Sequence, residues 1–423
     1  MFGVILSFFL YNHKGMPQYK KIISFAVVSA CILLILNFGV RSSLGFFLKP
    51  ISDTFGYGRE IFAFSLALQN LCWGLFQPLA GAFVDKFGIK KTVIVGSILY
   101  ALGLYVTATA ESALGLHIGA GIFIGMGIAG TGLGVVLPVM ARMVKPERRA
   151  FALGLGTAAG SAGQFLLIPV AQSFLAAYGW QTALLIMAIG ALSMMFFASP
   201  ISVEDSVNAK NIENNDQTFR ESLDEAFKHT HYWLLIAGFF VCGFQLAFIT
   251  VHMPSYLADN GFDSSVAAIS LSLIGLFNIF GSLIAGQLSG MYSKKWLLGY
   301  IYLGRAIAIV LFMVFPISTT SIYAFSIVTG FLWLATVPPT SGLVSQMFGL
   351  KYMATLYGFV FLNHQIGSFV GVWLGGYYFD QTGSYDNIWW AAAIIATITA
   401  IIHIFIDERP VERLRSKQET AKA

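Results

Sequence analysis

The sequence predicts an all-α integral membrane protein with twelve transmembrane helices in two pseudo-symmetric six-helix bundles. Hydrophobic residues make up 57% of the 423 residues, charged residues make up 11%, and mean hydropathy is +0.74. A water-soluble domain could not carry so much apolar surface. Twelve apolar runs of roughly 20 residues follow one another, each long enough to cross a bilayer. A polar insert separates the first six runs from the last six.

The chain therefore divides at this insert. We predict a cytoplasmic N-terminal segment (1–21), an N-terminal bundle (22–202), a cytoplasmic linker (203–231), a C-terminal bundle (232–407) and a cytoplasmic tail (408–423). The expected spans are approximately 22–48, 60–82, 92–110, 115–143, 150–176, 181–200, 232–257, 264–290, 296–315, 320–347, 353–377 and 388–406. The first 14 residues hold too few apolar side chains to span and lack a signal-peptide pattern, so Met16 is an equally good first residue. The acid-rich second part of the linker favours a short amphipathic helix.

Topology follows from the basic residues. Of the 25 Lys and Arg residues, 20 fall in the tails or in loops assigned to the cytoplasmic side, whereas Lys49 and Arg59 lie in an outer loop. Both termini are therefore expected in the cytoplasm. The sequence has no N-x-S/T sequon, which agrees with a bacterial inner membrane. The net charge of +5 is spread over short loops, so it indicates no nucleic-acid partner.

The most specific motif is the stretch Gly81–Lys91, GAFVDKFGIKK, between the second and third apolar runs. A glycine at its start lets two helices pack closely, and a second glycine permits a turn that residues with a Cβ resist. The charged side chains hold this turn in water. The predicted gating loop consists of Gly81, Asp85, Lys86, Gly88 and Lys90, joined by Arg142 from the cytoplasmic end of the fourth helix.

The two halves repeat one another at this motif. Trp73–Lys91 can be aligned with Asn278–Lys295, and membrane transporters are commonly built from such internal repeats. Gly290 stands where the counterpart of Asp85 would fall. The second loop is therefore predicted to lack the acid of the first.

Three arginines lie within predicted spans, whereas every Asp and Glu falls in a loop, a tail or a helix end. A guanidinium in the bilayer centre without a carboxylate costs on the order of a few kcal/mol, so each arginine needs a partner. Arg142 is assigned to the gating loop, and Arg305 is interpreted as structural, satisfied by carbonyls or by His403. Arg41 lies in a segment rich in small residues, in a helix expected to line the transport path. The alternative is that Arg41 extends to the outer headgroups.

A positive charge at Arg41 is suited to hold a carboxylate in a bidentate pair. Polar residues such as Asn70 and Gln245 mark the same path, and paired prolines in TVPPTSG (336–342) interrupt the tenth helix. The predicted substrate-binding residues are Arg41, Gln164, Asn278, Trp333, Asn363 and His364. Because no acid lies in the membrane interior, His364 and His252 are the candidate proton carriers, with a hydrogen-bonded structural role as the alternative for each.

Other functional classes lack their motifs. The three cysteines, Cys31, Cys72 and Cys242, lie inside apolar runs without the spacing of a disulfide or a metal site. No nucleotide-binding loop, zinc-protease motif or serine-hydrolase motif occurs with its supporting context. We therefore expect no enzymatic activity, no cofactor and no metal.

Several segments resemble a known family. The segment NFGVRSSLGFFLKPISDTFGYGREIFAFSLALQN (37–70), followed by the loop at 81–91, is similar to the first two helices of the monocarboxylate transporter family and its bacterial relatives within the major facilitator superfamily. The similarity extends through GWQTALLIMA, LIGLFNIFGSLIAG, TVPPTSGLV and HQIGSFVGVWLGGYYFDQTGSYD. This resemblance implies the major facilitator fold, and it implies that Asp85 helps to hold the cytoplasmic gate closed.

The resemblance also bears on the binding site. In that family a lysine on the first helix helps to bind the substrate carboxylate, and Arg41 stands at or beside its position. Animal members carry an aspartate and an arginine one turn apart on the eighth helix, which would fall on Asn278 and Ser282. Both charges are absent here, and so is the acidic motif at the start of the first helix. Those roles are therefore not carried over.

The sequence thus predicts a secondary transporter that moves a small, monocarboxylate-like organic anion by alternating access, with proton symport. Its expected partners are this anion, a proton and the lipid bilayer, and nothing demands more than a monomer. One alternative is transport of a larger amphipathic or multi-carboxylate compound, such as a carboxylate siderophore. Another is a non-transporting receptor, which the short termini and the short linker disfavour.

Overall fold

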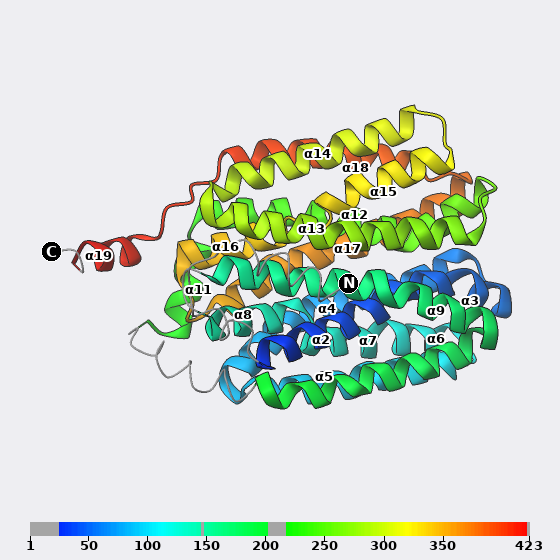
Figure 1. The fold of residues 1–423 in the computed structure, drawn as a ribbon, viewed down its shortest axis with the longest axis horizontal. Coiled ribbons are helices and arrows are strands. Elements are labelled where there is room, and N and C mark those ends of the chain that lie inside the picture. Colours follow the sequence, from blue (N-terminus) through cyan, green and yellow to red (C-terminus); the bar gives the residue numbers. More distant parts are fainter. Residues whose placement is uncertain (1–24, 145–147, 202–216, 421–423) are drawn as a thin grey trace, which may run out of the picture.

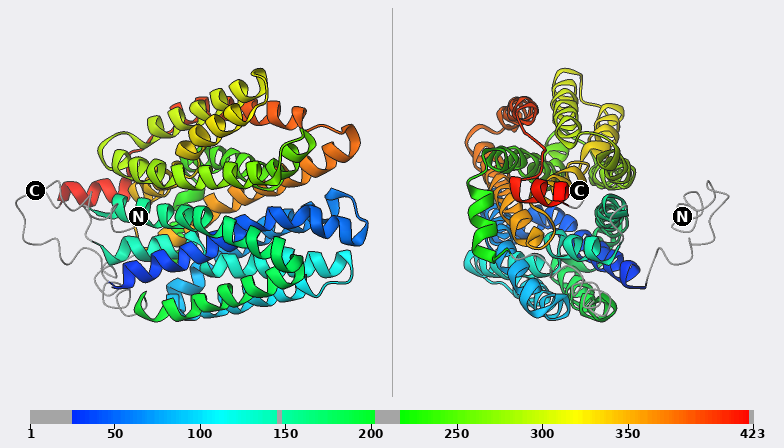
Figure 2. Two further views of the ribbon diagram at one scale, coloured as in Figure 1. Left: turned by 45° about the vertical axis from the view of Figure 1, so that its right-hand side comes forward. Right: turned by 90° about the vertical axis from the view of Figure 1, so that its left-hand side faces the viewer.

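The computed structural model describes residues 25–144, 148–201 and 217–420. Within these ranges the regular elements are all helices. Figure 1 shows long helices running side by side in two layers, with the N-terminal half below and the C-terminal half above. A view along the helices shows the two halves as adjacent groups (Figure 2, right). This arrangement agrees with the two sets of six apolar runs.

The N-terminal half holds the first six membrane crossings. Its elements are α2 (Phe25–Ser43), η2 (Leu44–Phe47), α3 (Leu48–Phe55), α4 (Arg59–Phe87), α5 (Ile89–Ala108), α6 (Ala113–Leu116), the π-helical η3 (His117–Phe123), α7 (Ile124–Thr131), α8 (Leu133–Met143), α9 (Arg149–Ser193) and η5 (Met194–Phe197). The long α9 contains the fifth and sixth crossings. It is interrupted at Gly179, whose φ of 77° is a conformation that residues with a Cβ resist.

The C-terminal half follows a short helix of the linker. Its elements are α11 (Phe219–Phe227), α12 (Thr230–Asp259), α13 (Ser264–Met291), α14 (Lys294–Val314), α15 (Thr319–Leu332), α16 (Val337–Phe348), α17 (Met353–Thr382), α18 (Asp386–Ile404) and α19 (Glu412–Thr420). Helices α15 and α16 form the two pieces of the tenth crossing. The predicted interruption of this crossing is thereby confirmed, but it lies at residues 333–336, just before the paired prolines, which stand in the first turn of α16.

The predicted number of crossings is confirmed as well. Nine helical segments of the described chain are long and apolar enough to cross a membrane, and one of them, Phe151–Ile201, contains two crossings divided at Gly179. Helices α4 and α17 add two more, with 29 and 30 residues. They are less apolar because they carry the polar clusters of the predicted transport path.

Some predicted boundaries were wrong by several residues. The first crossing continues to Phe55, because Pro50 falls in the first turn of α3, where a missing N–H leaves no helical hydrogen bond unmade. Helix α4 extends to Phe87 and α5 begins at Ile89, so most of the predicted gating loop is helical. The turn consists of Gly88, whose φ of 82° explains the glycine. Helix α17 likewise continues to Thr382.

Contacts between the two halves place the candidate site. Helix α4 packs against α17, and α9 packs against α13, so these two pairs form the seam between the bundles.

Within the C-terminal bundle, a Cβ at Gly243 would overlap the carbonyl oxygen of His364. This absence of a side chain lets α12 and α17 approach closely and fixes the depth of the polar segment on α17.

The linker contains the short helix that its acidic residues predicted. Helix α11 begins with a capping box, in which Thr218 Oγ1 accepts from the Glu221 N–H at 3.3 Å and Glu221 Oε2 accepts from the Thr218 N–H at 2.8 Å. Figure 1 shows α11 and α19 at the same end of the molecule. The predicted N-terminal segment (1–21) and residues 203–216 of the predicted linker lie outside the described residues.

Candidate substrate cavity

A narrow cavity lies where the two bundles meet. It has room for only about two or three water molecules in this conformation. Its lining residues are Phe38, Arg41, Ser42, Trp73, Leu133 and Gln164 from the N-terminal half, and Leu246, Thr250, Trp333, Leu334, Val337, Phe361, His364 and Ser368 from the C-terminal half. None of these lining side chains is acidic, and the ionisable ones are Arg41 and His364. The cavity is therefore an apolar chamber with a positive charge in its wall.

Arg41 is held in place by residues of α4. Its Nη2 donates to Asn70 Oδ1 at 2.8 Å, and its guanidinium carbon lies 5.0 Å from the ring centre of Trp73. Arg41 also lines a smaller adjoining cavity with Gln69 and Asn70. Its Nε is buried and has no hydrogen-bond partner among the described residues. Donor groups of this guanidinium thus remain for a ligand.

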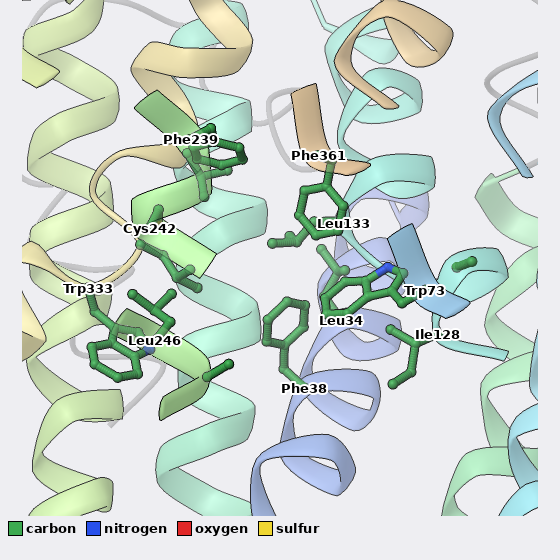
Figure 3. Packing of buried hydrophobic residues seen from close by; sticks show 14 of the residues in the cluster. Leu34, Phe38, Trp73, Ile128, Leu133, Phe239, Cys242, Leu246, Trp333 and Phe361 are labelled. Carbon is green, nitrogen blue, oxygen red and sulfur yellow. The ribbon is translucent and has the colours of Figure 1, made fainter. Parts of the chain in front are cut away.

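The two residues that hold Arg41 are themselves fixed by hydrogen bonds. Asn70 Nδ2 donates to the Leu66 carbonyl at 2.8 Å, so the amide oxygen must face Arg41. Trp73 Nε1 donates to Gln77 Oε1 at 2.9 Å. Figure 3 shows the Trp73 indole facing Phe38 and Phe361 across the centre of the molecule. Sequence reasoning identified Asn70 as polar in an apolar helix, but it gave no signal for Trp73.

His364 lines the same cavity from α17. Its ring stacks on Phe361 with 5.1 Å between ring centres, and it lies 4.8 Å from the ring centre of Phe239. These contacts place His364 between the two bundles. This position agrees with the prediction that His364 lies near the middle of the eleventh crossing. The other candidate proton carrier, His252, contributes to no cavity described here. Its Nε2 lies 2.8 Å from the Val372 carbonyl, inside an aromatic cluster of the C-terminal bundle.

Gln164 and Trp333 line the cavity, whereas Asn278 and Asn363 are not among its lining residues and bond to other protein groups. Asn278 Oδ1 accepts from the Leu334 N–H at 2.8 Å, and Asn278 Nδ2 donates to Ser161 Oγ of the other bundle at 2.7 Å. Asn363 Nδ2 donates to the Ile236 carbonyl at 2.7 Å. Substrate contact by these two residues stays a prediction.

The break in the tenth crossing is held by Arg305 of α14. Its Nε and Nη2 donate to the Leu332 carbonyl at 3.0 and 2.7 Å, and Nη2 also donates to the Trp333 carbonyl. These carbonyls end α15, where the helix dipole favours a positive charge. Arg305 therefore bonds to backbone carbonyls, as its interpretation as a structural residue predicts. His403, the other suggested partner, instead bonds the Thr399 carbonyl at 2.8 Å.

Residues 30–372 match the family described as Major Facilitator Superfamily. The chain belongs to this superfamily. It is 26% identical over 374 residues to monocarboxylate transporter 13 of Bos taurus, covering 85% of this chain and 83% of that protein. It is 24% identical over 387 residues to the oxalate:formate antiporter of Oxalobacter formigenes, covering 89% of each chain. Among solved structures it is similar to the E. coli fucose:proton symporter FucP, with 18% identity, a TM-score of 0.61 and coverage of 90% and 98%.

The predicted gating loop lies at the α4–α5 turn. Gly81 is buried in α4, Lys86 and Lys90 are exposed, and the Lys86 ammonium lies 5.2 Å from the centre of the Phe87 ring. Arg142 is half-buried in the last turn of α8. The Asp85 side chain lies outside the described part of the chain, so its gating role stays a prediction.

At the corresponding turn of the C-terminal half, a carboxylate comes from a different part of the chain. Glu408 Oε1 accepts from Ser293 Oγ at 3.1 Å and from the Lys295 N–H at the start of α14. The Glu408 carbonyl accepts from Gln346 Nε2 of α16 at 2.8 Å. Alignment of the two halves missed Glu408. The alignment compares the α4–α5 turn only with the α13–α14 turn, whereas Glu408 lies over a hundred residues after Ser293 in the sequence.

Proposed function

We propose that this chain is a secondary transporter of a small organic monocarboxylate, which binds to Arg41 in the cavity between the bundles. The observation that carries the proposal is a guanidinium in an apolar chamber whose described lining contains no acid. A buried positive charge without a counter-charge is costly, and a substrate carboxylate can supply the missing charge in a bidentate pair. The names of the two relatives, which specify a monocarboxylate transporter and an oxalate:formate antiporter, support an acid as the substrate.

Transport would proceed by alternating access in a bacterial inner membrane, with both termini in the cytoplasm. The bundles would rock about the cavity, exposing Arg41 to one side and then to the other. Proton symport is part of the proposal, with His364 as the proton-binding residue, because it is the other ionisable side chain in the cavity lining. Residues of both halves line this cavity, as a rocking mechanism requires.

Transport of a larger multi-carboxylate compound is the second candidate. The name of one relative includes oxalate, an acid with two carboxylates, which supports a second carboxylate but not a larger size. The narrow cavity and the single cation in its described lining favour the smaller, singly charged acid instead.

Uptake into proteoliposomes tests the proposal. Purified protein is reconstituted and offered a panel of labelled monocarboxylates and dicarboxylates, with and without an inward proton gradient. We expect saturable uptake of monocarboxylates that the gradient stimulates several-fold. Binding of an acid without accumulation would indicate a receptor. Failure of every acid to bind or accumulate would refute the carboxylate site.

Glu408 gives a separate prediction about gating. The Glu408 side chain bonds to the α13–α14 turn and its carbonyl bonds to α16, so Glu408→Ala leaves the Lys295 N–H without its acceptor and weakens the link between the turn and α16. The bond from Lys294 Nζ to Gln346 Oε1 at 2.6 Å still joins the turn to α16. We expect turnover to fall about three- to tenfold while KM stays within about twofold, as is typical for a gating step. Initial uptake rates over a range of substrate concentrations provide the measurement. The control is Glu412→Ala, an exposed acid of the same tail. A rise in KM with unchanged turnover would contradict the gating role.

A further inference from the structure

A second, smaller cavity lies inside the C-terminal bundle, beside the cavity that holds Arg41. The two cavities share Leu246 and Trp333 as a common wall. Figure 3 shows these two side chains next to each other, on the opposite side of the seam from Trp73. The smaller cavity has room for about one water-sized group.

Three polar side chains from three helices line this cavity. They are Gln245 of α12, Arg305 of α14 and Thr329 of α15, with exposed fractions of 2%, 2% and 5%. Gln245 Oε1, Arg305 Nη1 and Thr329 Oγ1 are buried, and none has a hydrogen-bond partner in the part of the chain that is described. A buried polar atom left unpaired costs about 1–3 kcal/mol. Three of them around one small space therefore point to a ligand group.

The hydrogen bonds that these residues do make fix their orientations. Gln245 Nε2 donates to the Ala392 carbonyl at 2.9 Å, so its amide oxygen is the atom left for the cavity. Arg305 uses Nε and Nη2 on the carbonyls that end α15, which leaves Nη1. Thr329 lacks the bond to the preceding turn that Thr250 makes to the Leu246 carbonyl at 2.7 Å. Its hydroxyl is thus available as well.

The set consists of one charged donor, one acceptor and one hydroxyl that can do either. A group that fills it must both accept and donate a hydrogen bond, which is the property of a hydroxyl. A second carboxylate fits poorly, because its oxygens would face the Gln245 oxygen and because three heavy atoms exceed the space of one water. A methyl or methylene group would leave all three polar atoms unpaired.

We propose that Gln245, Arg305 and Thr329 form a second subsite, which binds one hydroxyl group of the substrate while its carboxylate binds at Arg41. This inference rests on the proposed carboxylate transport. Trp333 stands in the break between α15 and α16, so its side chain can move without disrupting a helix. Such a movement would join the two cavities, which share Leu246 and Trp333 as lining residues. The subsite makes Gln245 and Thr329 specificity-determining residues, because they distinguish a hydroxylated acid from its deoxy counterpart.

Competition between matched acids tests the subsite. Lactate with propionate, and 3-hydroxybutyrate with butyrate, are compared as substrates of the reconstituted protein. We expect the wild type to prefer each hydroxy acid by at least about tenfold in turnover over KM. Thr329→Val should reduce that ratio about five- to tenfold. Thr329→Ser, which keeps the hydroxyl, should retain the ratio.

Thr107→Val is the matched control, because Thr107 is buried but donates its hydroxyl to the Gly103 carbonyl of its own helix at 2.7 Å. If Thr329→Val does not fold, Thr329→Ala replaces it. Equal uptake of the members of each pair by the wild type, or an unchanged ratio in Thr329→Val, would overturn the subsite and leave carboxylate transport standing. Absence of uptake of all four acids would overturn both.

Discussion

Replacing Arg41 with glutamine is expected to lower the affinity for a carboxylate substrate at least about 100-fold and to abolish measurable uptake at low concentration. The guanidinium is the one cation in the lining of the larger cavity, and charge-assisted hydrogen bonds in a buried site contribute about 1.5–3 kcal/mol each. Arg41→Lys keeps the charge but loses the planar pair of donors, so we expect a loss of about tenfold. Substrate titrations of initial uptake rate measure both effects.

Two observations separate loss of binding from loss of folding in Arg41→Gln. Removing a buried charge relieves its desolvation, so the thermal stability of the variant should stay within a few degrees of the wild type. The matched control is Lys49→Gln, which removes an exposed cation paired with Asp53 at 2.5 Å and should change neither uptake nor stability. Wild-type affinity in a folded Arg41→Gln protein would mean that the carboxylate binds elsewhere.

The charge count along the chain could single out Arg41, which the structure places in the cavity lining, because that count uses only sequence and the cost of a buried ion. It could not predict the partners of Arg41. Asn70 and Trp73 lie on another helix, and which face of α4 meets α2 depends on packing between apolar helices, for which the sequence carries little directional signal. The aromatic wall of Phe38, Trp73 and Phe361 was missed for the same reason.

The helices could be predicted because length and hydropathy decide whether a segment spans the bilayer. The predicted helix boundaries were wrong where backbone conformation, and not hydropathy, decides where a helix ends. Gly88 permits a one-residue turn, so α4 and α5 absorb most of a loop whose charges indicated a longer connection. Glu408 was missed because it acts through tertiary contacts with Lys295 and Gln346, far from it in sequence.

The polar residues of the predicted path divide into two groups once packing is known. Arg41, Gln164 and His364 line the cavity, whereas Asn278 bridges the broken tenth crossing to Ser161 of the other bundle. Membrane depth could be estimated from sequence for all four. The direction in which each side chain points could not, because a polar group in a helix bundle serves equally well as a ligand or as an interhelical hydrogen bond.

Replacing Arg305 with methionine is expected to lower stability by about 2–6 kcal/mol, because two carbonyls at the end of α15 lose their donor in a buried site and each unpaired group costs about 1–3 kcal/mol. Trp333, whose carbonyl is one of the two, should then shift, so uptake should also fall strongly. Arg305→Lys should recover part of the stability, since an ammonium can still bond to a carbonyl and complement the helix dipole.

Thermal unfolding in detergent and in lipid, followed by intrinsic tryptophan fluorescence, measures the effect of Arg305→Met. The matched control is Arg409→Met, in which the lost arginine is exposed and pairs with Asp407 at 2.5 Å outside the membrane-spanning helices. This control should stay close to the wild type, because exposed ion pairs contribute about 0–1 kcal/mol. A stable Arg305→Met protein that still transports would show that the break in the tenth crossing is held by its prolines and by Asn278 alone. A destabilised Arg305→Met beside an unchanged Arg409→Met would show that the bonds of Arg305 to the end of α15 stabilise the break in the tenth crossing.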